Sequence, residues 1–196
     1  MSRLLYLFLA ALLLFLSVAP VRAQQTAIPD TDYLLWSATR RLTAADFQMP
    51  LKPHVNLRGS SAAFGFGMHG SPYDLLSKRG NNIVVNRMLR TASWLDTNNP
   101  DQVAPQVLFQ QTLFDIQEIY VRRFRQQARA NAKKIVLIGK PDVNELMEEQ
   151  LKACQQRQAE YAEATDYGSL LGTQAVWESQ IQKELQELQA YKASTK

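Results

Sequence analysis

The sequence predicts an α+β fold, in which a small antiparallel or mixed sheet packs on a long central helix and two further helices follow at the C-terminal end. Apolar residues alternate in residues 61–69, and a period of two is typical of a strand with one buried face. From Asp101 or Val103 to about Asn131 there is no glycine, and the only proline, Pro105, falls in the first turn, where a helix tolerates it.

The N-terminal residues have the three parts of a secretory signal peptide. Arg3 supplies a positive start, residues 4–19 form a run without charge, and Val21 and Ala23 occupy the −3 and −1 positions of a cleavage site. We therefore expect residues 1–23 to be removed and the protein to be periplasmic, in a Gram-negative-type envelope, or secreted. An uncleaved anchor is the alternative, but the run is shorter than the roughly 20 residues of a membrane span, so no stable span is expected after cleavage.

The remaining chain is expected to hold a flexible segment, residues 24–32, and a single domain, residues 33–192. Near its start, Thr43 is positioned to cap one helical turn that ends at Phe47. A second strand is predicted for residues 82–95.

The strand predicted at residues 61–69 has two different faces. One face is apolar and consists of Ala62, Phe64, Phe66 and Met68. The opposite face consists of Ala63, Gly65, Gly67 and His69. Glycine inside a strand marks either a bend or the close approach of another backbone or a ligand, and both interpretations are open.

The C-terminal half is predicted to be mainly helical. Residues 135–138 form either a short strand or the packed end of the long helix. Asp142 caps a helix over residues 142–164, and Gly168 suits the left-handed stop after it. The last helix, residues 173–191, carries a core-facing apolar stripe.

Charge and cysteine content limit the function classes. Loss of Arg3 and Arg22 with the leader lowers the formal charge from +4 to +2. The basic residues of the long helix are expected to spread around a solvated surface, so we predict no nucleic-acid partner. These residues are Arg122, Arg123, Arg125, Arg129, Lys133 and Lys134. Cys154 is the only cysteine and is predicted to be a packing residue, because the two histidines, His54 and His69, lie far from it in the sequence.

Several short motifs follow one another along the chain in a recognisable order. They are Trp36, Asp46-Phe47, Ser93-Trp94, Gln111, Phe114-Asp115-Ile116, Glu118-Ile119-Tyr120, Arg122, Tyr161, Thr165, Gly168, Gln174 and Trp177. This order resembles a secreted bacterial family of predicted zinc-dependent proteases, catalogued only as a domain of unknown function. The family pattern runs H-E-Q-x-H-F-D-I-x-E-I-Y-x-R in the central helix, then Y-D-x-E-T-x-H-G and Q-x-x-W. The resemblance implies a zincin-like fold for residues 33–192.

The differences from the family fall on the residues that would bind and use zinc. The two histidines of the helix correspond to Phe109 and Leu113, the glutamate to Gln110, and the later histidine, a candidate third ligand, to Tyr167. A catalytic zinc usually needs three protein ligands and an open water position. Phe and Leu offer no lone pair, and Gln cannot take a proton from water. The sequence therefore predicts no metal, no cofactor and no catalytic residue at these four vestigial site positions.

An apolar stripe replaces the ligand face. It consists of Phe109, Leu113, Ile116, Tyr120 and Phe124 at helical spacing. Either this stripe closes the former site and serves stability alone, or an apolar groove remains and binds a peptide or another protein. Glu118 and Arg122 are expected to form an ordinary pair on the helix surface.

The sequence thus predicts an exported, catalytically inactive homologue of a zinc metalloprotease that binds an unknown peptide or envelope protein. The predicted binding edge consists of Phe64, Gly65, Phe66, Gly67 and His69, because zincins commonly align a substrate as an added strand. One alternative is a hydrolase with a non-zinc or rearranged site, for example His69 with a nearby acid. Another is a purely structural envelope component that assembles through its last helix.

Overall fold

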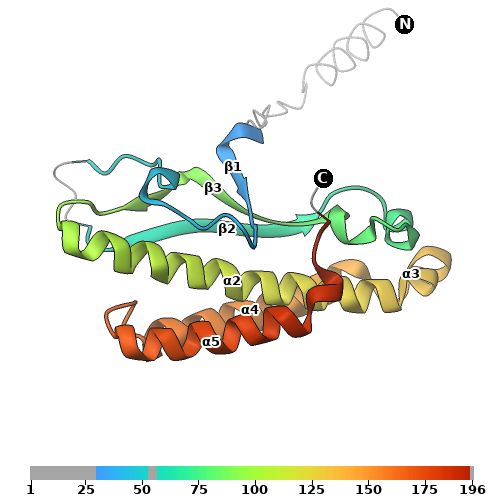
Figure 1. The fold of residues 1–196 in the computed structure, drawn as a ribbon. Helices are drawn as coiled ribbons and strands as arrows, with labels where there is room; N and C mark the ends of the chain where they lie inside the picture. Colours follow the sequence, from blue (N-terminus) through green and yellow to red (C-terminus); the bar gives the residue numbers. More distant parts are fainter. Residues whose placement is uncertain (1–29, 53–56, 195–196) are drawn as a thin grey trace, which may run out of the picture.

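A computed structural model describes residues 30–52 and 57–194 as a three-stranded antiparallel sheet with helices on one side (Figure 1). The strands are β1 (Tyr33–Leu35), β2 (Ser60–Met68) and β3 (Val84–Leu95), in the spatial order β1-β3-β2. The helices are α2 (Pro100–Ala130), α3 (Ala132–Ile138), α4 (Val143–Ala164) and α5 (Leu171–Glu187). The predicted α+β class and long central helix are confirmed, and of the two predicted kinds of sheet the antiparallel one is present. Three described helices follow the long one, where two were predicted. The predicted signal peptide lies outside the described residues.

Helix α2 is the middle layer of the fold (Figure 1). On one side Phe114 packs on the sheet, where its ring stacks on that of Phe64 with a centroid distance of 4.8 Å. On the other side Phe109 and Tyr120 belong to a buried cluster with Cys154 of α4 and residues of α5. Because both sides of α2 are covered, most of its central residues are buried whatever their polarity.

A β-bulge interrupts the pairing of β2 with β3 between Ser61 and Ala63. The buried Ser93 hydroxyl bridges the irregularity, since it accepts a hydrogen bond from the Ala63 amide at 2.9 Å and donates one to the Leu89 carbonyl at 2.7 Å. The predicted Ser93-Trp94 motif therefore has a structural use at this point. A bulge of this kind increases the local twist of a sheet.

The structure shows how the predictions for residues 135–138 and for the start of α4 turn out. Residues 135–138 belong to the separate short helix α3, so the strand alternative is wrong. The Asp142 carboxylate accepts a hydrogen bond from the Asn144 amide at 2.7 Å and caps α4 as expected. Within the described ranges no helix is long and apolar enough to cross a membrane.

The turn after α4 packs tightly on α2. Gly168 has a φ of +88°, and a Cβ at this position would lie 2.8 Å from the Cβ of Phe109. Both the left-handed backbone and the close approach require glycine here. The loop between α4 and α5 is thereby held against the first half of α2.

We expect Gly168→Ala to lower the free energy of unfolding by about 1–3 kcal/mol, because it adds both backbone strain and overlap with Phe109. Gly172→Ala is the matched control, since Gly172 lies in α5 and a Cβ there meets nothing within 4 Å. The control should be neutral or stabilise by up to about 1 kcal/mol. Urea unfolding followed by circular dichroism measures both, and equal effects would contradict the tight packing of the turn.

Candidate functional site

Two of the four predicted vestigial site positions, Phe109 and Leu113, lie on the side of α2 that faces α4 and α5, and a third, Tyr167, lies beside them in the turn after α4. The Phe109 ring is buried and stacks on the Tyr161 ring with a centroid distance of 5.3 Å. Leu113 packs against the same cluster. The Tyr167 ring lies 6.4 Å from the Phe109 ring, although 62% of Tyr167 is exposed. The structure thus brings the predicted third-ligand position beside the helix.

Gln110, the fourth position, points to the sheet. Its amide Nε2 donates to the Ser60 carbonyl at 3.2 Å and to the Ser60 hydroxyl at 3.0 Å. The side chain is buried, so this amide fastens the start of β2 to α2. In the part of the chain that the structure describes, no group of three or more His, Cys, Asp or Glu side chains is arranged to hold a metal ion.

The predicted binding edge lies on β2, which has one strand neighbour, β3. Phe64 and Phe66 face the helical side and pack against buried residues of α2 and β3. Gly65 and Gly67 face the opposite side, where an added Cβ would meet nothing within 4 Å. The space directly above these two glycines is therefore free of described atoms to a distance of 4 Å.

The free edge of β2 can be identified from its hydrogen bonds. The His69 amide donates to the Ile83 carbonyl at 2.6 Å, so His69, Gly67 and Gly65 direct their amide groups toward β3. The alternate residues Phe64 and Phe66 direct theirs away from the sheet. Within the described ranges no strand pairs with this row, and an unpaired row of this kind is a template for an added strand. His69 itself is exposed, and it forms no ion pair with a described acid.

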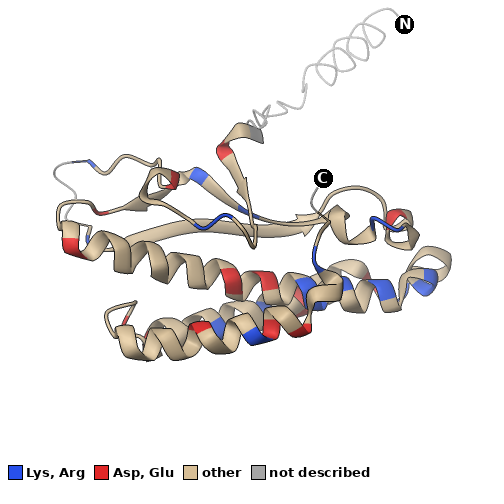
Figure 2. Ribbon diagram, viewed as in Figure 1, with Lys and Arg blue, Asp and Glu red and all other residues tan. Residues whose placement is uncertain are grey.

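A charged cluster lies at the centre of α2. Glu118 Oε1 accepts from Arg122 Nε at 2.9 Å and from Arg125 Nη1 at 3.0 Å, and Glu118 Oε2 accepts from Asn86 Nδ2 at 3.2 Å. The side chains of Glu118 and Arg122 are only 2% and 3% exposed. The expectation of an ordinary surface pair is therefore wrong. Figure 2 shows acidic residues in the middle of α2 and basic residues after them along the helix.

The two arginines of this cluster connect separate parts of the fold. Arg122 donates to the Leu185 carbonyl of α5 at 2.6 Å. Arg125 donates to the Val84 carbonyl of β3 at 2.6 Å and to the Tyr191 carbonyl at 3.1 Å. Arg122 and Arg125 were predicted to lie on a solvated surface, and both are buried instead. The spacing of residues 118, 122 and 125 places them on one helix face and could have indicated a cluster.

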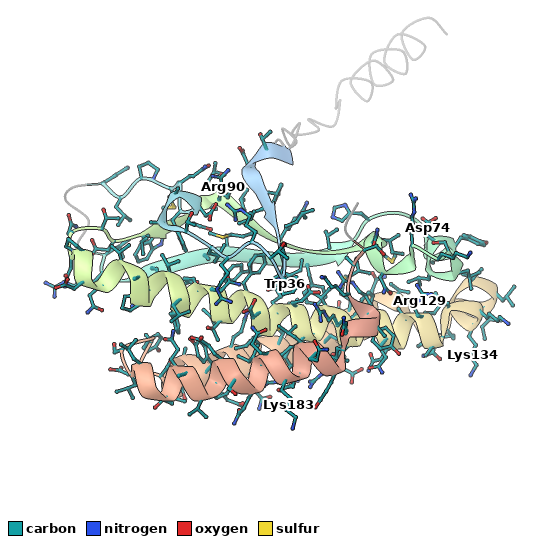
Figure 3. All side chains as sticks on the ribbon, in the orientation of Figure 1. Trp36, Asp74, Arg90, Arg129, Lys134 and Lys183 are labelled. Carbon is teal, nitrogen blue, oxygen red and sulfur yellow. The ribbon has the colours of Figure 1, made fainter. Side chains whose placement is uncertain are left out.

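Asp115 is a second buried acid, one turn before Glu118. Its Oδ1 accepts from Trp36 Nε1 at 2.7 Å and from Gln111 Nε2 at 2.8 Å. Burial raises the pKa of the Asp115 carboxyl, while these hydrogen bonds and the charge of Arg41 act to lower it. The Trp36 and Asp115 motifs are thus joined by a direct contact, with Trp36 between the sheet and α2 (Figure 3).

Two cavities adjoin Trp36. One, of about 150 Å³, is lined mainly by polar groups that include Asp115 and Arg122. The other, of about 450 Å³, has an apolar wall with Leu35 and Val84. Both cavities lie beside the buried charges of α2 and not at the packed Phe109 ring.

Cys154 is buried among apolar residues of α4 and its neighbours. Burial raises the pKa of this thiol to about 12, while the charge of Arg157 opposes the shift. The thiol stays protonated near neutral pH, and a protonated thiol is a poor nucleophile. Cys154 is a packing residue, as predicted.

We expect Glu118→Gln to lower the free energy of unfolding by about 3–5 kcal/mol, because two buried guanidinium groups lose their counter-charge. Glu163→Gln on the exposed surface of α4 is the control and should change stability by less than about 0.5 kcal/mol. Urea unfolding measures both variants. A loss below about 1 kcal/mol for Glu118→Gln would show that the arginines do not depend on this carboxylate.

The raised pKa of Asp115 predicts a pH dependence. The folded protein takes up this proton at a higher pH than the unfolded chain, so the native protein gains stability relative to Asp115→Asn as pH falls from 7 toward about 4. Urea unfolding of both proteins across this range measures the difference, and the other carboxyl groups cancel in it. Parallel curves for the two proteins would contradict the raised pKa.

Comparison with known proteins adds no relative. No family model, curated protein or solved structure matches the chain. The resemblance to the zinc-dependent protease family therefore stays a prediction from the sequence motifs.

Proposed function

We propose that this protein is an exported, catalytically inactive homologue of a zincin-like metalloprotease and that it acts by binding an extended peptide segment. The observation that carries the proposal is the state of the helix positions that would hold zinc. Phe109 and Leu113 are packing residues, and the Gln110 amide is used to hold Ser60. These three side chains supply neither a metal ligand nor a general base.

The free edge of β2 supports the binding part of the proposal. Phe64 and Phe66 present backbone donors and acceptors to that edge, and strand addition uses such groups for affinity. The open glycine face at Gly65 and Gly67 leaves room for the side chains of a bound segment. The partner is thus an unstructured peptide or a segment of an envelope protein that can become extended.

The hydrolase alternative has less support. It requires His69 near an acid, whereas His69 is exposed and forms none of the described ion pairs. The other candidate nucleophile, Cys154, is buried and protonated. Neither His69 nor Cys154 therefore combines exposure with an activating partner.

The strand-addition proposal is tested with the chain from Gln24 and a random peptide library displayed on phage. Peptides selected on this chain should bind Phe66→Pro at least about tenfold more weakly than Phe66→Ala, because only proline removes the outward amide. The comparison with alanine separates the lost N–H from the lost side chain, and circular dichroism checks folding. Equal binding by the two variants would exclude the β2 edge.

The same selected peptides test the loss of catalysis. Incubation with excess zinc should leave them intact. Cleavage that a chelator stops, and that Gln110→Ala also stops, would overturn the inactive-homologue proposal while leaving the binding edge as a separate question.

A further inference from the structure

The short helix α3 ends in two unusually exposed apolar residues. Leu137 is 80% exposed and Ile138 is 68% exposed, and among the described residues these are the two most exposed large hydrophobic side chains. The helix lies at one end of the molecule, where the chain passes from α2 to α4 (Figure 1). These side chains therefore contribute little to the fold that surrounds them.

Helical spacing places the exposed residues of α3 on one continuous face. Ala132 and Ile135 point inward and belong to a buried cluster with Leu75. The outward residues are separated by three or four positions and so lie side by side. They are Lys133, Lys134, Leu137 and Ile138. We call these four residues the α3 face.

The chain around the α3 face is basic. Residues 119–141 contain no acidic residue, and Figure 2 shows basic residues along the second half of α2 and on α3. Arg122 and Arg125 are used in the buried cluster, but Lys133, Lys134 and Lys140 are exposed. Lys134 lies at this end of the molecule, beyond Arg129 (Figure 3).

The acidic residues nearest to this basic surface lie on the first turns of α4 and on the segment that packs on α3. Asp142 is the next acid along the chain, and its carboxylate caps α4. The exposed Glu145, Glu148 and Glu149 follow on the first two turns of α4, and against them stand Lys133, Lys134 and Lys140. On the neighbouring segment that packs on α3, Asp74 binds the Ser71 amide at 2.9 Å and is accompanied by the exposed Lys78 and Arg79.

We propose that the α3 face docks on an anionic lipid surface. In this arrangement Leu137 and Ile138 enter the boundary between headgroups and acyl chains, and Lys133, Lys134 and Lys140 contact lipid phosphates. Apolar residues next to lysines are the combination that interfacial helices use, and lysine stems extend to the headgroups. A nucleic acid would use the lysines but would gain little from two aliphatic side chains.

Contact with a membrane surface does not depend on the proposed function. It uses α3, whereas peptide binding uses the edge of β2. It also needs no membrane-spanning helix, because the two aliphatic residues reach only the interface.

The test is co-sedimentation of the chain from Gln24, which retains every described residue, with sucrose-loaded vesicles at about 0.1 M salt. Vesicles of phosphatidylcholine with phosphatidylglycerol should bind the protein at least about tenfold more tightly than vesicles of phosphatidylcholine alone. Leu137→Ser with Ile138→Ser should reduce this binding about tenfold or more, and so should Lys133→Gln with Lys134→Gln.

Matched controls use exposed residues elsewhere. Leu170→Ser with Leu171→Ser changes an exposed apolar pair at the start of α5, and Lys152→Gln with Lys183→Gln removes two exposed lysines from α4 and α5. Neither control should alter vesicle binding, and near-ultraviolet circular dichroism checks that all variants fold.

Three results would overturn the proposal. They are equal binding to both kinds of vesicle, an unchanged affinity for the apolar α3 variant, and equal losses in the controls. If only the lysine variant lost vesicle binding, the contact would be a general one with polyanions. That result would also exclude insertion of Leu137 and Ile138. A fluorophore attached through Ile138→Cys gives an independent measure, because its emission should shift to the blue on anionic vesicles. The native Cys154 is buried and protonated, so the new thiol is the one that reacts.

Discussion

The hydrogen-bonded ion pairs of Glu118 with Arg122 and Arg125 hold the layers of this fold together. One carboxylate, buried in the middle of α2, compensates two buried guanidinium groups. Through their remaining donors these arginines reach the sheet at Val84 and the C-terminal end at Leu185 and Tyr191. Buried charges of this kind are tolerated only when they are paired and hydrogen-bonded, so the positions of α2, β3 and the chain end depend on one another.

Because β1 is short, Arg125 is needed as a hydrogen-bond donor to β3. β1 pairs with β3 only as far as Arg87, and the Trp36 amide adds one bond to the Asn86 carbonyl. Beyond that point the Val84 carbonyl has no strand neighbour among the described residues on this side, and it accepts a hydrogen bond from Arg125 instead. The same gap leaves room for the larger of the two cavities beside Trp36. The Asn82 side chain and the backbone of Ser194 exchange hydrogen bonds at the rim.

The helix positions that the sequence comparison predicts as a former zinc site also have structural roles. Phe109 packs under Gly168, Gln110 fastens β2, and Glu118 joins the layers, so the polar and apolar residues of α2 alike have structural uses. The proposed peptide-binding site lies outside this interior, at the backbone edge of β2. A membrane contact through α3 would use a third region, separate from both the β2 edge and the buried residues of α2.

The amino-acid sequence was enough to predict the α+β class, the long helix, the alternating strand and the Asp142 cap. These features depend on local spacing, which a chain carries without its tertiary contacts. It also determined that Phe109, Gln110 and Leu113 cannot act as zinc ligands and base. The packing of the layers was needed to show that Glu118, Arg122 and Arg125 are buried, because polar residues on a helix look solvated until a second layer covers them. It likewise decided that Gln110 faces Ser60 while Phe109 faces Tyr161, since local spacing does not specify which neighbours the two sides of α2 meet.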